Sequence, residues 1–226
     1  MKKKSLITMV LSLALVAVIG TGATLAYLSA NSNKVVNTFT VGSGYDDEEN
    51  GLYVDEQEVD GNGVATGKST RKGNKYDEIL PGDKLSKDPT VHFTQGPDSY
   101  IFVKVTGMSE AKINTPAENV FTYLNNMLGS TDTNGAWEKI DGSTELNGVY
   151  VYHVGDDYKV AANDTLVPLF TGVQLNGNLN VAQFNELKDN GTVKGISDIT
   201  IQSAAVQFDN VADKTAAYAL VKGLFN

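Results

Sequence analysis

The chain has 226 residues, of which 41% are hydrophobic and 20% charged, and its formal net charge is −9. This acidity argues against nucleic acids and anionic lipid surfaces as partners, since both repel a negatively charged protein. No cysteine occurs, which excludes disulfide bonds, thiol catalysis and a cysteine-linked lipid anchor.

The N-terminus has the pattern of a secretory signal peptide. Three lysines at positions 2–4 are followed by an uncharged apolar segment over 6–19 and by small residues up to Ala26. A basic start, an apolar region of about 7–15 residues and a small-x-small site precede signal-peptidase cleavage. We therefore predict cleavage between Ala26 and Tyr27, which makes residues 1–26 the signal peptide.

An uncleaved membrane anchor is the alternative, because the charge-free run continues to Asn33. An anchor needs about 20 consecutive apolar residues, and small or polar residues at positions 20–24 interrupt this run. Cleavage is therefore preferred, with the membrane as a partner only before it. Removing the three lysines takes the net charge from −9 to about −12. Residues 27–226 are long enough for a single β-sandwich domain with a sizeable core.

Period-two alternation of apolar residues predicts the strands of this domain. The predicted strands cover residues 34–41, 100–106, 149–154, 166–170 and 199–208. Asn-Gly and Asp-Gly pairs recur between them, and such pairs tolerate the positive φ angles of tight turns. Strands separated by many such turns predict a mainly β antiparallel sandwich rather than a parallel sheet.

Two or three short helices are expected in the loops. Thr115 to Glu118 matches a capping box, and an apolar stripe from Val120 to Leu128 follows at helical spacing. A second helix is predicted from Asn180 to before Gly191, and the Ala-rich residues 211–221 are a third candidate. Each apolar stripe is interpreted as core packing.

The acidic, Gly-rich segment 43–75 is predicted to be a long flexible loop or a mobile hairpin, because large apolar residues are scarce in it. Its carboxylates have the chemistry to bind Ca²⁺, but no stretch has the spacing of an EF-hand loop. We therefore predict a solvated charge run, with no metal and no cofactor.

Catalytic motifs are missing from the sequence. The two histidines, His92 and His153, lie far apart in strand-like segments and belong to no H-E-x-x-H helix. No G-x-S-x-G elbow, phosphate-binding loop or dinucleotide-binding glycine motif occurs. Both histidines are therefore interpreted as strand residues, and no catalytic residue and no enzyme activity are predicted.

Three motifs occur in order along the chain: Gly20–Ser29, Asn37–Gly42 and Leu80–Val91, the last containing Pro-Gly-Asp and Lys-Asp-Pro-Thr-Val. Together they resemble the TasA/camelysin family of secreted proteins with a SipW-dependent type of signal peptide. Later landmarks that are similar to the family's are Trp137, Tyr150–Tyr152, Leu169–Phe170, Ile199–Ile201 and Ala205–Gln207. The resemblance therefore spans nearly the whole chain.

The resemblance implies a jelly-roll-like β-sandwich, exported by a Gram-positive bacterium, cleaved by an ER-type signal peptidase and located in a biofilm matrix or on the cell surface. It implies a fibre subunit whose N-terminal strand completes the sheet of a neighbouring copy, head to tail. The donor strand would be residues 34–41, with Val35, Val36, Phe39 and Val41 at the contact. Other matrix proteins or polysaccharide are further partners on this interpretation.

Three alternatives stay open at this point. The N-terminal strand can fold back into its own domain, either instead of donation or before it. The protein can be an extracellular adhesin that binds a surface polymer through its loops. A camelysin-like metallopeptidase is the third, although the zinc motif of such enzymes is missing here.

Overall fold

The structure is a computed structural model that describes residues 29–31, 35–36, 38–39, 51–76, 78–113, 118–142, 145–189, 192–193 and 199–225. Within these residues the chain is mainly β, with three antiparallel sheets, two short ladders and two short α-helices. The expected signal peptide, Ala26 and Tyr27 lie outside them. None of the helices described here is long and apolar enough to cross a membrane.

The largest sheet has seven strands and is built around β8 and β17. Its order is β12 (Ala136–Asp141), β13 (Gly148–His153), β8 (Ser99–Thr106), β17 (Thr200–Gln207), β2 (Val35–Val36) and β3 (Thr38–Phe39), and β1 (Ser29–Asn31) also pairs with β17. β8 and β17 pair antiparallel over their full length. The strands predicted over 100–106, 149–154 and 199–208 are confirmed as β8, β13 and β17.

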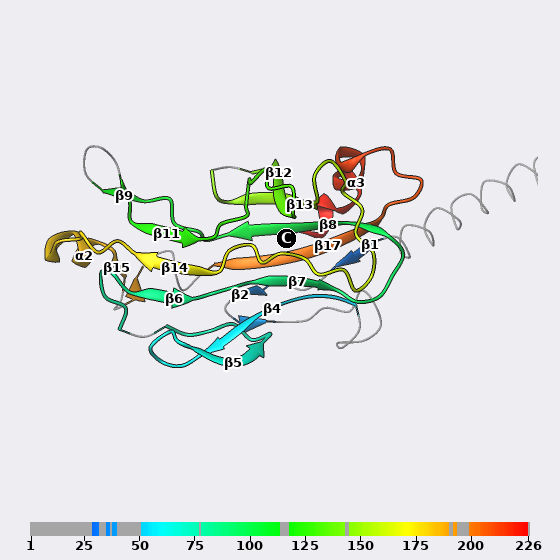
Figure 1. The fold of residues 1–226 in the computed structure, drawn as a ribbon. Coiled ribbons are helices and arrows are strands. Elements are labelled where there is room, and N and C mark those ends of the chain that lie inside the picture. The colour runs from blue at the N-terminus through cyan, green and yellow to red at the C-terminus, as the bar shows by residue number, and fades with distance from the viewer. Residues whose placement is uncertain are drawn as a thin grey trace, which may run out of the picture.

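Two three-stranded sheets form a second layer, and Figure 1 shows β6, β7 and β4 running below β8 and β17. Their orders are β11 (Phe121–Leu124), β14 (Gly172–Leu175), β6 (Lys84–Ser86) and β5 (Ala65–Thr70), β4 (Leu52–Val59), β7 (Thr90–Phe93). The short ladders join β9 (Lys112–Ile113) to β10 (Glu118–Asn119) and β15 (Lys188–Asp189) to β16 (Thr192–Val193). The predicted mainly β antiparallel architecture is therefore confirmed.

Apolar side chains fill the space between the layers. The large sheet contributes Ile101, Val103, Val105, Trp137, Tyr150, Tyr152, Ile201 and Ala205, and the facing sheets contribute Val54, Leu85, Val91, Phe93, Phe121, Tyr123, Val173 and Leu175. Successive residues of a strand point to opposite faces. Tyr100 and Phe102 of β8 accordingly belong to a second cluster on the outer face. Burial on both faces explains the nearly continuous apolar run in this strand.

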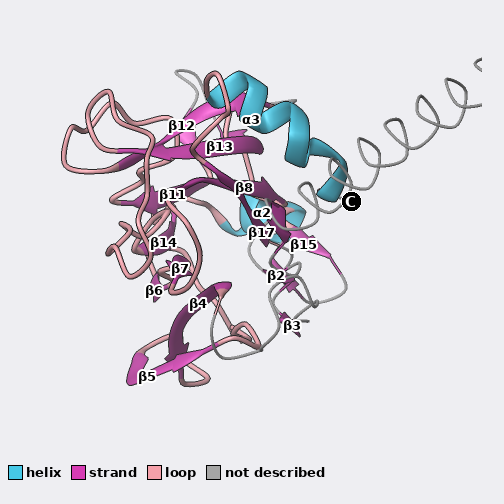
Figure 2. Ribbon diagram, turned by 90° about the vertical axis from the view of Figure 1, so that its right-hand side faces the viewer, coloured by secondary structure: helices cyan, strands magenta, loops and turns pink. Residues whose placement is uncertain are grey.

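Two of the predicted helices form, the first shorter than expected because Lys188 and Asp189 belong to β15. α2 (Val181–Glu186) begins with a capping box between Asn180 and Gln183. α3 (Lys214–Val221) is capped by Asp213 and continues into the 3₁₀-helix η1 (Lys222–Leu224). Ala217 and Val221 of α3 pack into the outer cluster, and Figure 2 shows the helix lying over the large sheet.

The helix predicted after residue 115 is wrong, because its described part forms β10 and β11. Phe121 and Tyr123 are buried and Thr122 between them is exposed, which is period-two alternation. Aromatic and β-branched residues favour strands, and pairing with β14 buries this alternating face. The spacing of the apolar residues fitted both the helical and the strand period, and pairing with β14 made this segment a strand.

The segment 43–75 is predicted to be a long flexible loop or a mobile hairpin. In its described part, from residue 51, β4 and β5 form a hairpin, which is the second of these alternatives, and β4 also pairs with β7. The strand predicted over 166–170 does not form, although Leu166, Leu169 and Phe170 are buried. Pro168 has no backbone N–H to donate to a ladder, so this stretch packs as irregular chain.

Candidate assembly site

β17 is buried on both faces. Ile201 and Ala205 belong to the core between the layers, whereas Ala204 and Val206 belong to the outer cluster beneath α3. The side chain of Gln202 is also buried, and its amide donates to the carbonyl of Leu224 at 2.9 Å. A strand enclosed in this way needs partners along both of its edges, because water cannot satisfy its backbone groups.

The two edges of β17 are covered differently. One edge is paired with β8 along all eight residues. On the other, β1 lies antiparallel with Ser29 opposite Val206 and Asn31 opposite Ala204, and β2 follows with Val35 opposite Ile201. In the described residues, this second edge of β17 is therefore covered by N-terminal segments alone.

The N-terminal cover changes register along β17. The numbers of paired residues sum to 235 in β1 and to 236 where Val35 meets Ile201. The register of the N-terminal cover therefore differs by one residue between the two described pairings, with the additional residue on the N-terminal side.

The expected donor residues have the following places. Val35 and Val36 form β2, and Phe39 lies in β3, while Val41 lies outside the described residues. β3 pairs antiparallel with β2, so the chain reverses direction between them. The segment differs in this respect from the single strand predicted over 34–41, and among its described residues β2 is the part that pairs with β17.

The pairing of β1 was missed at the sequence level. Ser29, Ala30 and Asn31 are small or polar and show no apolar alternation, so their own pattern predicts no strand. The sequence signal for this pairing lies in β17, because neither face of the uncharged run from Ile201 to Val206 is made of polar residues that could be left in contact with water. A strand of that composition predicts burial on both faces, and the backbone of a strand buried in this way needs a partner along each edge.

His92 lies on the surface of the β4–β7 pair. Its Nε2 is 2.8 Å from Asp55 Oδ1, and its ring stacks on Tyr53 with 4.7 Å between centroids. The guanidinium of Arg71 lies over the other ring at 3.6 Å from the Tyr53 centroid. The contacts are those of a cross-strand pair, and they bring no second histidine to this place.

His153 lies at the end of β13 beside a cavity of about 310 Å³. Its two ring nitrogens face the carbonyl oxygens of Gly155 and Ser130, at 2.9 and 3.3 Å. Glu138 lines the same cavity but is held by Lys214, with Nζ 2.6 Å from Oε1. The structure thus keeps the two histidines in separate surroundings.

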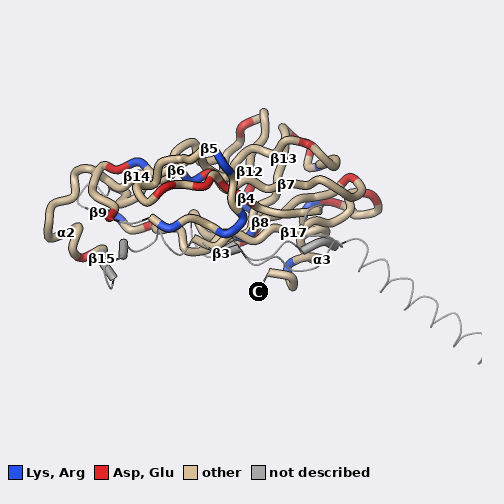
Figure 3. The backbone as a smooth tube through the Cα atoms, turned by 90° about the horizontal axis from the view of Figure 1, so that it is seen from below, with Lys and Arg blue, Asp and Glu red and all other residues tan. Residues whose placement is uncertain are grey.

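No group of three or more acidic or histidine side chains able to hold a metal ion occurs within the described part of the chain. Figure 3 shows acidic residues spread over strands and loops along the molecule. Residues 46–49, the most acidic part of the segment considered for Ca²⁺, lie outside the described residues.

Comparisons with known proteins assign no family to this chain. No protein-family model matches it, and the searches of curated proteins and of solved structures also find no match. Function is therefore inferred from the residues and contacts described above.

Proposed function

We propose that this protein is a secreted structural subunit that assembles into extracellular fibres by exchanging its N-terminal strands between copies. One observation carries the proposal: β17 is buried on both faces, and one of its edges is covered by β1 and β2 from the N-terminus. A segment that covers an interior edge in one chain has the chemistry to cover the same edge in a second, identical chain.

Exchange of this kind conserves the backbone hydrogen bonds, because the edge of β17 keeps an antiparallel partner of the same sequence. The monomer is then self-complemented, and the fibre is complemented by the preceding subunit. The contact is head to tail and does not close on itself, so it propagates a filament. Covering the edge in the monomer also protects it from unspecific strand addition before assembly.

The remaining parts of the proposal follow from the sequence. Export uses the signal at 1–26, cleaved between Ala26 and Tyr27 by an ER-type signal peptidase, and a jelly-roll connectivity is expected for the sandwich. The mature protein belongs to a biofilm matrix or cell surface of a Gram-positive bacterium, with itself as principal partner. Its acidity of about −12 keeps the free subunit soluble.

Sedimentation and negative-stain microscopy of protein beginning at Tyr27 test the proposal. We expect concentration-dependent filaments, and we expect a variant lacking residues 27–41 to form none. The control is the variant Thr122→Ala, an exposed position on β11 that leaves the N-terminal strands and β17 untouched. The fibre assignment would be contradicted if the mature protein stayed monomeric at all concentrations and the N-terminal deletion had no effect. Binding of such a monomer to a surface polymer would favour the adhesin instead.

A further inference from the structure

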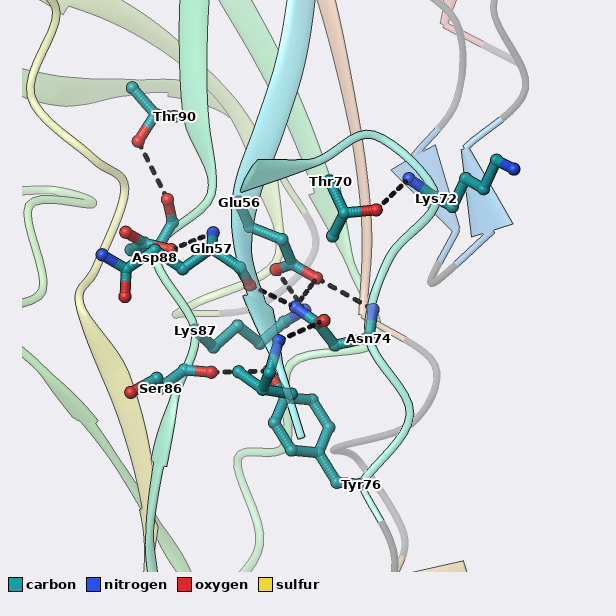
Figure 4. Close-up of polar contacts among 11 residues, drawn as sticks. Glu56, Gln57, Thr70, Lys72, Asn74, Tyr76, Ser86, Lys87, Asp88 and Thr90 are labelled. Carbon is teal, nitrogen blue, oxygen red and sulfur yellow. Dashed lines mark hydrogen bonds and ion pairs between the residues drawn. The ribbon is translucent and has the colours of Figure 1, made fainter. Parts of the chain in front are cut away.

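Glu56, Asn74 and Lys87 form a buried polar cluster at the junction of the second layer. Their exposed fractions are only 3%, 7% and 2%, although two of them are charged residue types. Glu56 lies on β4, Asn74 follows β5, and Lys87 follows β6. Figure 4 shows the three side chains converging on one point from these three segments.

The carboxylate of Glu56 binds the nitrogens of both other side chains. Lys87 Nζ lies 2.8 Å from Oε2, and Asn74 Nδ2 lies 3.0 Å from Oε1. On its other side, Asn74 Oδ1 accepts a hydrogen bond from the backbone N–H of Val59 at 2.9 Å. An amine, a carboxamide and a carboxylate are thus held together in a site closed to water.

The surroundings of the cluster favour a fixed geometry. Asn74 Nδ2 also donates to the carbonyl of Gln57 at 2.6 Å, so the amide plane is oriented on both sides. The ring of Tyr76 lies beside Lys87, with Nζ 5.9 Å from its centroid, and the Tyr76 hydroxyl is fixed on the carbonyl of Ser86 at 2.7 Å. Holding reacting groups in place in this way removes much of the entropic barrier to their reaction.

We propose that Lys87 and Asn74 form an intramolecular isopeptide bond, with Glu56 as the group that carries the protons. The bond joins Nζ of Lys87 to Cγ of Asn74. It does not depend on the proposed fibre function.

The atoms and charges of the reaction balance without an external reagent. Glu56 Oε2 accepts a proton from the Lys87 ammonium, and the neutral amine attacks Cγ of Asn74. The developing negative charge on Oδ1 is stabilised by the Val59 N–H, which already points at that oxygen. The Cγ–Nδ2 bond then breaks as Glu56 transfers one proton from Nζ to Nδ2. Nδ2 leaves as ammonia, the second proton lost by Nζ stays on Glu56 as the neutral acid, and nothing is oxidised or reduced.

The product also avoids the cost of burying two charges. An ion pair taken out of water is costly unless the attraction between its charges repays the lost hydration. The reaction replaces the buried ammonium with a neutral amide and leaves Glu56 as a neutral acid. The chain has no cysteine, so an amide cross-link is a covalent staple that it can form without a disulfide. The staple would tie the segment after β5 to the β6–β7 connection.

Intact-mass spectrometry of the whole folded protein, followed by tryptic mapping, tests the inference. We expect a mass lower by one molecule of ammonia and a branched peptide that joins residues 73–75 to residues 85–104, since Lys87 is no longer a cleavage site. A succinimide at an Asn-Gly pair loses the same mass, so the branched peptide decides. The full mass, or an ammonia loss without the branched peptide, would overturn the inference.

Variants separate the roles of the three residues. Glu56→Gln, which keeps the shape of the side chain, and Lys87→Arg, which keeps the charge, should both restore the full mass, whereas the exposed control Lys84→Arg should keep the cross-link. Asn74→Asp should lose water in place of ammonia when the bond forms. Circular dichroism shows whether each variant is folded. A branched peptide in folded Glu56→Gln protein would exclude Glu56 as the proton carrier.

Discussion

Ala30 of β1 lies directly opposite Ala205 of β17, in the antiparallel pair that covers the second edge of β17. Residues opposite each other in such a pair are close enough for a disulfide when both are cysteine. Because the chain has no cysteine of its own, this position reports which chain supplies the strand.

Mixing Ala30→Cys protein with Ala205→Cys protein under assembly conditions should therefore produce covalent heterodimers after mild oxidation. Neither variant can form this disulfide within one chain, so the dimer requires exchange of the N-terminal strand. Non-reducing electrophoresis of the washed filaments measures it. The control pairs Ala30→Cys with Thr122→Cys, an exposed position on β11. Filaments that form without the heterodimer would show that another surface makes the contact.

The buried pair of Glu56 and Lys87 should matter far more for stability than the exposed pair of Asp98 and Lys159. Glu56→Ala leaves the Lys87 amine buried without its partner carboxylate, which costs about 3–5 kcal/mol in comparable cases, and it also prevents the proposed isopeptide bond, so the loss of unfolding free energy should reach at least this size. Asp98→Ala removes an ion pair whose side chains are 42% and 45% exposed, and the unfolding free energy should change little. Urea denaturation of the two variants measures the contrast, and equal effects would contradict it.

Phe121→Ala should destabilise the protein by about 3–5 kcal/mol, because it empties a large site in the core. Thr122→Ala, one residue further along β11, should stay within about 0.5 kcal/mol, because that side chain faces solvent. Thermal unfolding of both variants measures the difference. A large effect at residue 122 as well would mean that the alternation of β11 is not what buries this segment.

The contact between Lys214 and Glu138 should make stability depend on pH at the acidic end. Burial opposes ionisation of Glu138, but hydrogen bonds from Lys214 and Tyr158 outweigh it and lower the pKa of the carboxyl below its usual 4.5. A lowered pKa in the folded state stabilises the fold above pH 4.5, and this contribution is lost as the pH falls through the folded-state pKa.

In Glu138→Gln protein the unfolding free energy should consequently fall less steeply than in wild type as the pH is lowered from about 6 to about 3. Denaturant titrations at several pH values measure this, with Glu186→Gln, an exposed position on α2, as the control. Parallel curves for wild type and Glu138→Gln would show that the carboxyl makes no pH-linked contribution.

Local sequence pattern identified the strands in which apolar residues recur clearly. β8, β13 and β17 are six to eight residues long and rich in β-branched, aromatic or other apolar residues, so local pattern and tertiary pairing agree. It failed at 121–124, where one apolar spacing suited both a helix and a strand. The caps of α2 and α3 were easier, because Asn180 and Asp213 act within their own helical turns.

Long-range pairings were beyond the reach of local pattern. Glu56 lies in a segment whose composition predicts solvent exposure, and its partner Lys87 is 31 residues away. Ser29 to Asn31 pair with a strand near the opposite end of the sequence. In both cases the decisive contact is set by topology, which determines what a charged or small residue meets after folding.

The one-residue change of register along β17 would make the proposed assembly selective for identical subunits. A strand that followed β17 without the additional residue would bring Val35 opposite Thr200 instead of Ile201. A slip by one residue turns every later side chain of a strand to the other face of the sheet. Identical subunits share the number of residues between β1 and β2, so their strands would pair with β17 in this register. A related chain with a shorter or longer spacer would not.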